Sequence, residues 1–135
     1  MASIAAAQTP VQLDPFAQAT AGMPTCPPVS PRMYTSDEMR TEAHSRAERG
    51  TRCALEGTCE PGGAYKRDGE INERVRAAII ADKRLADTSI YVTTSRKWVT
   101  LKGCVRTNAQ RNAVTALVRK QADVERVFDD LTLRR

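Results

Sequence analysis

The sequence predicts an α+β fold in which two helices cover one face of a three-stranded sheet, giving a two-layer αββαβ sandwich. Two alternating, β-branched runs at 89–94 and 98–105 are joined by a very short connection, which is typical of a β-hairpin. Amphipathic helical spacing flanks this hairpin on both sides, over 69–83 and 109–121. A last strand at 124–133 supplies the third strand that is needed to bury one face of the sheet.

The prolines divide the chain into an extension and a compact domain. All 7 of them lie at or before Pro61 in the chain of 135 residues, and none follows. We therefore expect three parts. They are a signal remnant with a proline-rich, disordered or extended leader at 1–34, a helix with a cysteine-containing loop at 35–66, and the compact domain at 67–135.

The extension contains one predicted helix. Thr35 and Glu38 have the spacing of a capping box, and Gly50 is placed to end the helix after about residue 49. The apolar stripe of this helix is thin, so the helix must pack on another part of the protein or fray. In the compact domain, Asp68 and Asn108 are the predicted caps of the two helices.

The excess positive charge lies on the compact domain. Residues 68–135 carry 14 basic and 9 acidic side chains, whereas residues 1–67 carry 7 of each. A basic surface favours anionic partners such as phospholipid headgroups, nucleic acid or acidic protein surfaces. The same charge is also what an ordinary solvated surface carries.

The cysteines point to an oxidising compartment. Residues 2–8, ASIAAAQ, look like the end of a trimmed secretory signal peptide, and an even number of cysteines in an exported chain indicates disulfides. Cys104 could reach any of the other three, and four cysteines allow three pairings. The preferred pairing is Cys53–Cys59 together with Cys26–Cys104.

The compact domain carries a series of spaced apolar motifs. They are Val75-x3-Ile79, Ile90-x-Val92, Val99-Thr100-Leu101-x-Gly103-x-Val105, Arg111-x-Ala113 and Val124-x2-Val127-x3-Leu131-x-Leu133. With these residues the compact domain resembles the BON domain, the small αββαβ module of bacterial cell-envelope proteins. The resemblance covers about residues 68–134 and is weaker at two turn positions, where Lys97 and Asp123 replace expected glycines.

The resemblance implies a periplasmic or secreted protein without enzymatic activity that binds phospholipid or envelope proteins. One module is present, so paired-module avidity would require a homo-oligomer. We expect at most peripheral membrane association, because no apolar run is long enough to span a bilayer. The alternative is a structural subunit that docks a partner protein.

Two surfaces are candidate binding sites. The first is the open sheet face, where Tyr91, Trp98 and Phe128 lie beside Lys102; aromatic side chains suit protein interfaces and membrane boundaries. The competing interpretation is that the extension folds over this face. The second is a basic set for anionic surfaces, made of Arg96, Lys97, Arg106, Arg111, Arg119 and Lys120.

Catalysis and metal binding receive little support. The chain has 1 histidine, His44, and no C-x-x-C pair or phosphate loop. Asp129 and Asp130 are adjacent on a strand, so they point to opposite faces. We therefore predict no enzyme and no cofactor. Nucleic-acid binding is an alternative for a cytoplasmic protein, but the sequence lacks an RRM-type aromatic motif and a GXXG loop.

Overall fold

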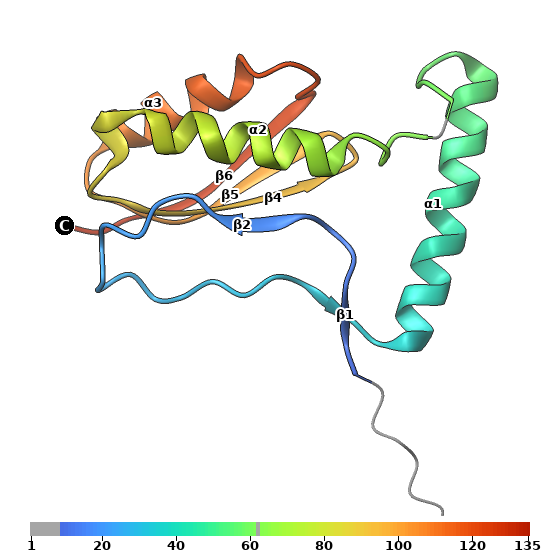
Figure 1. Ribbon diagram of the computed structural model, residues 1–135, viewed down its shortest axis with the longest axis horizontal. Helices are drawn as coiled ribbons and strands as arrows, with labels where there is room; N and C mark the ends of the chain where they lie inside the picture. Colours follow the sequence, from blue (N-terminus) through green and yellow to red (C-terminus); the bar gives the residue numbers. More distant parts are fainter. Residues whose placement is uncertain (1–8, 62) are drawn as a thin grey trace, which may run out of the picture.

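The protein has a mixed α+β fold in a computed structural model that describes residues 9–61 and 63–135 (Figure 1). The predicted signal remnant at 2–8 lies outside the described residues. The elements are β1 (Val11–Gln12), β2 (Phe16–Gln18), β3 (Met33–Tyr34), α1 (Ser36–Glu56), α2 (Asp68–Ala81), η1 (Lys83–Leu85), β4 (Ser89–Ser95), β5 (Trp98–Val105), α3 (Asn108–Arg119) and β6 (Arg126–Leu133).

The main sheet has the strand order β2-β4-β5-β6. β4 and β5 form the predicted antiparallel hairpin, and β6 runs parallel to β5, with α3 as the crossover between them. The expected three strands are therefore present, but the sheet has a fourth. β2 comes from the extension and pairs antiparallel with β4, so that Phe16 lies opposite Thr93.

The hydrophobic core lies between the sheet and the two helices that cover it, α2 and α3 (Figure 1). Alternation along β4 and β5 sends one set of side chains into this core and the other set to the open face. The buried cluster comprises Ile71, Val75, Ile79, Leu85, Ile90, Val92, Val99, Leu101, Val105, Val114, Val118 and Leu131.

Asp68 holds the hairpin turn instead of capping a helix, which corrects our prediction. Its two carboxylate oxygens accept hydrogen bonds from the backbone N–H groups of Arg96 and Lys97, at 2.8 and 2.9 Å. Both turn residues have positive φ, 58° and 63°, a conformation that costs energy for any residue with a Cβ. Asp68 is buried, and burial raises its pKa despite the two hydrogen bonds that lower it.

Two other helix boundaries also differ from the prediction. α1 begins with the predicted capping box but continues through Gly50 to Glu56, and it ends at Gly57, which has a left-handed φ of 76°. Gly50 is instead a point of close approach, because a Cβ there would lie 3.1 Å from the Cα of Gly63. α3 is capped by Thr107 through a capping box with Gln110, so Asn108 is the first helical residue and not the cap.

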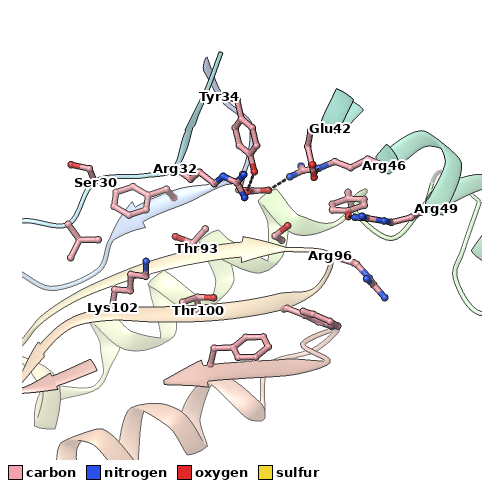
Figure 2. A pocket seen from close by; sticks show the side chains of 17 residues that line it. Ser30, Arg32, Tyr34, Glu42, Arg46, Arg49, Thr93, Arg96, Thr100 and Lys102 are labelled. Atoms are coloured by element: carbon pink, nitrogen blue, oxygen red, sulfur yellow. Dashed lines mark hydrogen bonds and ion pairs between the residues drawn. The ribbon is translucent and has the colours of Figure 1, made fainter. Parts of the chain in front are cut away.

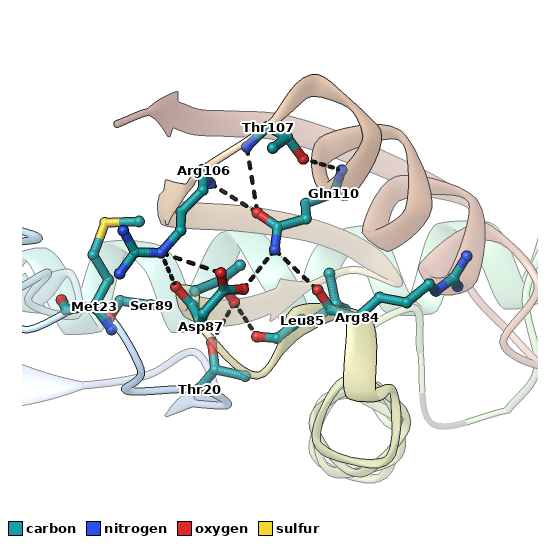
Figure 3. A network of polar contacts seen from close by, with 10 residues as sticks. Thr20, Met23, Arg84, Leu85, Asp87, Ser89, Arg106, Thr107 and Gln110 are labelled. Carbon is teal, nitrogen blue, oxygen red and sulfur yellow. Dashed lines mark hydrogen bonds and ion pairs between the residues drawn. The ribbon is translucent and has the colours of Figure 1, made fainter. Parts of the chain in front are cut away.

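The segment 19–34, here called the strap, fastens the extension to the sheet. Leaving β2, it is anchored by Met23, whose backbone N–H donates to Ser89 Oγ at 3.1 Å and whose carbonyl accepts from that hydroxyl at 2.9 Å (Figure 3). The Cys26–Cys104 disulfide follows. The strap then returns along the open sheet face to β3, which pairs with β1 (Figure 1).

α1 stands at the hairpin end of the sheet and has no buried residue (Figure 1). Its main tie to the rest of the protein is the ion pair between Arg46 and Asp14 at 2.8 Å. Glu42, on the same helix, also pairs with Arg46 at 2.9 Å. The Cys53–Cys59 disulfide closes the loop at its end. The strap and not this helix is therefore the part of the extension that lies over the open sheet face.

Candidate binding groove and aromatic rim

A groove of about 360 Å³ separates the strap from the open sheet face (Figure 2). Ser30, Arg32 and Tyr34 project from the strap side, while Thr93 and Thr100 project from the sheet. The further lining residues are Asp14, Phe16, Val29, Glu42, Arg46, Arg49, Tyr65, Ser95, Arg96, Trp98, Lys102 and Phe128.

The end of the groove next to α1 is closed by a compact polar network. Arg46 donates to Asp14 and to Glu42, and Tyr34 Oη donates to the other oxygen of Asp14 at 3.4 Å. Burial, and after it the Asp14 carboxylate, raises the pKa of Tyr34, so the phenol keeps the proton that it donates. This network holds one guanidinium group and two carboxylates, so Arg46 offsets one of the two negative charges.

Elsewhere in the groove the positive charges are not compensated. Within the described ranges, Arg32, Arg96 and Lys102 form no ion pair. The guanidinium group of Arg32 lies over the Tyr34 ring, with 4.5 Å from Cζ to the ring centroid. The groove is therefore a basic site, in which the two lining carboxylates, Asp14 and Glu42, pair with Arg46 and not with these three side chains.

The aromatic side chains form two separate pairs. Phe16 stacks on Tyr91 with 5.8 Å between ring centroids, so β2 partly covers Tyr91. Trp98 and Phe128 lie 5.7 Å apart at the other side of the sheet, and Phe128 is 38% exposed. The extension thus covers one part of the open face and leaves the Trp98–Phe128 pair accessible.

Two guanidinium groups lie against the Trp98 ring. Cζ of Arg96 is 4.8 Å from the ring centroid, and Cζ of Arg126 is 5.3 Å from it. The group of Trp98, Phe128, Arg96 and Arg126 is called the aromatic rim below. It combines exposed aromatic surface with positive charge at the hairpin end of the sheet.

The family-model comparison matches the BON domain to residues 67–135. The chain belongs to the BON domain family. The comparisons with curated proteins and with solved structures found no match. BON membership suggests a non-enzymatic, envelope-associated module, and the two disulfides are compatible with an exported protein.

The BON domain here carries its predicted aromatic residues on one sheet face, with Lys102 exposed beside them. Lys102 lies opposite Tyr91 in the β4–β5 register, and both side chains point away from the helices. The four predicted cysteines form the preferred pairs, Cys26–Cys104 and Cys53–Cys59. Of the four residues predicted for the open sheet face, Trp98, Phe128 and Lys102 line the groove.

The predicted basic residues do not form a single patch on the BON domain. Arg106 donates to the carbonyl of Asp87 and forms an ion pair with its carboxylate, at the end of β5 opposite the hairpin turn (Figure 3). Arg111 pairs with Asp129 at 3.4 Å. The remaining four lie at the hairpin turn and at the end of α3: Arg96, Lys97, Arg119 and Lys120.

Sequence reasoning missed two site residues. Arg126 lies two positions before Phe128 on β6, so strand alternation alone places both on the open face. Arg32 gave no such signal, because it lies in an irregular proline-rich segment whose position depends on the disulfide.

Among the residues that the structure describes, no helix has the length and apolar character to cross a membrane. Within those same residues, no three His, Cys, Asp or Glu side chains are grouped so that they could hold a metal ion.

Proposed function

We propose that this BON protein is a non-enzymatic envelope module that attaches peripherally to anionic phospholipid surfaces through its aromatic rim. The observation that carries the proposal is the placement of two guanidinium groups against Trp98 beside the exposed ring of Phe128. Trp is favoured at the boundary between headgroups and acyl chains, and Arg is attracted to anionic headgroups. The rim offers both at one place.

The charge near the rim supports weak, salt-sensitive attachment. Arg119 lines a shallow hollow together with Arg126 and Phe128, so it adds a third cation close to the rim. Glu125 lines the same hollow and offsets part of this charge. Each basic residue near an anionic surface contributes about 1 kcal/mol, and salt screens this attraction over roughly 10 Å.

Vesicle cosedimentation tests the proposal. Vesicles of phosphatidylglycerol mixed with phosphatidylcholine should bind the protein, and added salt should release it. Trp98→Ala and Arg126→Ala should each weaken binding, the second by about 1 kcal/mol or roughly fivefold. Lys83→Ala is the matched control, because it removes an equally exposed positive charge at the opposite end of the sheet.

Three outcomes would count against attachment through the rim. They are binding to pure phosphatidylcholine that equals binding to the anionic vesicles, binding that is indifferent to salt, and equal losses for Arg126→Ala and Lys83→Ala. Salt-independent capture of a protein through Trp98 would instead support the docking alternative.

A further inference from the structure

We propose that the groove under the strap is a second binding site, which takes an extended acidic segment of a partner protein. This function goes beyond lipid attachment: it shares Arg96 with the aromatic rim but also uses two charged residues outside the rim, Arg32 of the strap and Lys102 of β5. A single chain segment with carboxylate side chains fits the groove in shape, in charge and in hydrogen-bonding capacity.

The shape of the groove is that of an extended chain. Its floor is formed by strands β4 and β5, and its wall is the strap, which runs along the same open face (Figures 1 and 2). From Trp98 to Lys102 the floor advances four residues along one strand, which is about 13 Å at 3.3 Å per residue. The volume of about 360 Å³ is typical of a preformed ligand site.

The charge of the groove requires an anionic ligand. Lys102 lies toward one end of the floor and Arg96 toward the other, with Arg32 facing them from the strap (Figure 2). The acidic lining residues, Asp14 and Glu42, both pair with Arg46, which leaves one negative charge against the four other basic side chains that line the groove. An extended segment with acidic residues at positions i and i+4 matches the roughly 13 Å from Trp98 to Lys102, and its carboxylates would pair with cations that form no ion pair with another described residue.

The remaining lining residues suit a peptide backbone and apolar side chains. The hydroxyl groups of Ser30, Thr93 and Thr100 form no side-chain hydrogen bond with other described residues, although all three line the groove. They are available to the amide groups of a bound segment. Phe16 and Phe128 offer apolar surface to side chains that alternate with the acidic ones.

The strap is held in place before any ligand arrives. The Cys26–Cys104 disulfide and the two hydrogen bonds between Met23 and Ser89 fix its far end. The opposite end is fixed by the β1–β3 pairing and by Tyr34, which is buried. A groove with both walls fixed binds with a smaller loss of conformational entropy than a flexible one.

Fluorescence anisotropy with a labelled peptide tests the site. The probe is a short peptide in which glutamate alternates with valine, and its glutamine–valine counterpart is the uncharged control. The glutamate peptide should bind the full, oxidised chain and the glutamine peptide should not. Arg32→Ala and Lys102→Ala should each weaken binding about tenfold, since each removes one charge-assisted contact. Lys83→Ala should leave the Kd unchanged.

The outcomes separate this site from the aromatic rim. Trp98 belongs to both, so the comparison uses Arg32→Ala, which should lose peptide and keep vesicle binding. Equal peptide binding by wild type, Arg32→Ala and Lys102→Ala would overturn the proposal. Loss of vesicle binding in Arg32→Ala, with peptide binding absent in the wild type, would assign the groove to lipid headgroups instead and overturn it as well.

Discussion

Replacement of Asp68 tests whether a buried carboxylate can stabilise a hairpin turn made of two residues with side chains. The carboxylate accepts both turn N–H groups, and each such bond contributes about 1.5 kcal/mol, while burial of the carboxylate offsets part of this gain. Asp68→Ala should therefore lower the free energy of unfolding by about 2 kcal/mol. Urea denaturation measures this change, and hydrogen exchange at the amides of Arg96 and Lys97 locates it.

A serine at this position separates the turn role of Asp68 from a helix-capping role. Serine is a good N-cap, so Asp68→Ser would restore most of the lost stability if capping were the function of the carboxylate. The two N–H groups donate to two different carboxylate oxygens, and the single oxygen on the shorter serine side chain cannot take both positions, so we expect Asp68→Ser to be nearly as unstable as Asp68→Ala. Recovery of stability in Asp68→Ser, or unchanged exchange at the two turn amides in Asp68→Ala, would refute our account of the turn.

Two further predictions concern the ionisation of Asp68 and the two disulfides. The pKa of Asp68 is raised above its ordinary value of 3.8, so folding disfavours ionisation of this carboxyl group, and part of its contribution to stability is lost as pH rises from that value through the raised pKa. Urea titrations at several pH values should show the wild type losing stability relative to Asp68→Asn with rising pH; a parallel pair of curves would contradict this. Replacing Cys26 and Cys104 by alanine removes a disulfide with a sequence separation of 78 and should lower the free energy of unfolding by about 4.5 kcal/mol. Replacing Cys53 and Cys59 removes one with a separation of 6 and should lower it by about 2 kcal/mol. Thermal denaturation of the two double variants measures both losses. Equal losses in the two double variants would show that chain entropy does not set the difference.

The αββαβ order was predictable because its signals are local. Helical spacing, strand alternation and the two-residue connection at Arg96 and Lys97 each depend on neighbours in sequence. The observed helices and strands of residues 68–133 confirm this order.

The fourth strand could not be predicted in this way. β2 has three residues, Phe16–Gln18, and shows no alternation long enough to detect. It is a strand because the edge of β4 offers hydrogen-bonding partners to it, which is a tertiary effect. The same holds for the groove, whose strap side depends on the Cys26–Cys104 link between distant parts of the chain.

The prediction that Asp68 caps a helix failed for a related reason, whereas the Thr35–Glu38 capping box is confirmed. Asp68 has the right residue type and position for a cap, but the hairpin turn brings two N–H groups to its carboxylate from 28 and 29 residues away. A left-handed turn at Arg96 and Lys97 is not visible in the sequence, since neither is a glycine.

The Cys26–Cys104 link also sets the order in which the chain can oxidise. During synthesis from the N-terminus, Cys26, Cys53 and Cys59 all become available before Cys104, which lies 78 residues after its partner. Cys53 and Cys59 are six residues apart and can form their native pair as soon as both are present, because a short loop costs little entropy to close. Cys26 must wait for Cys104, and a bond that it formed meanwhile with Cys53 or Cys59 would have to be undone by thiol–disulfide exchange. Early closure of the Cys53–Cys59 loop thus protects Cys26 from the wrong partner until the β5 cysteine of the αββαβ core is made.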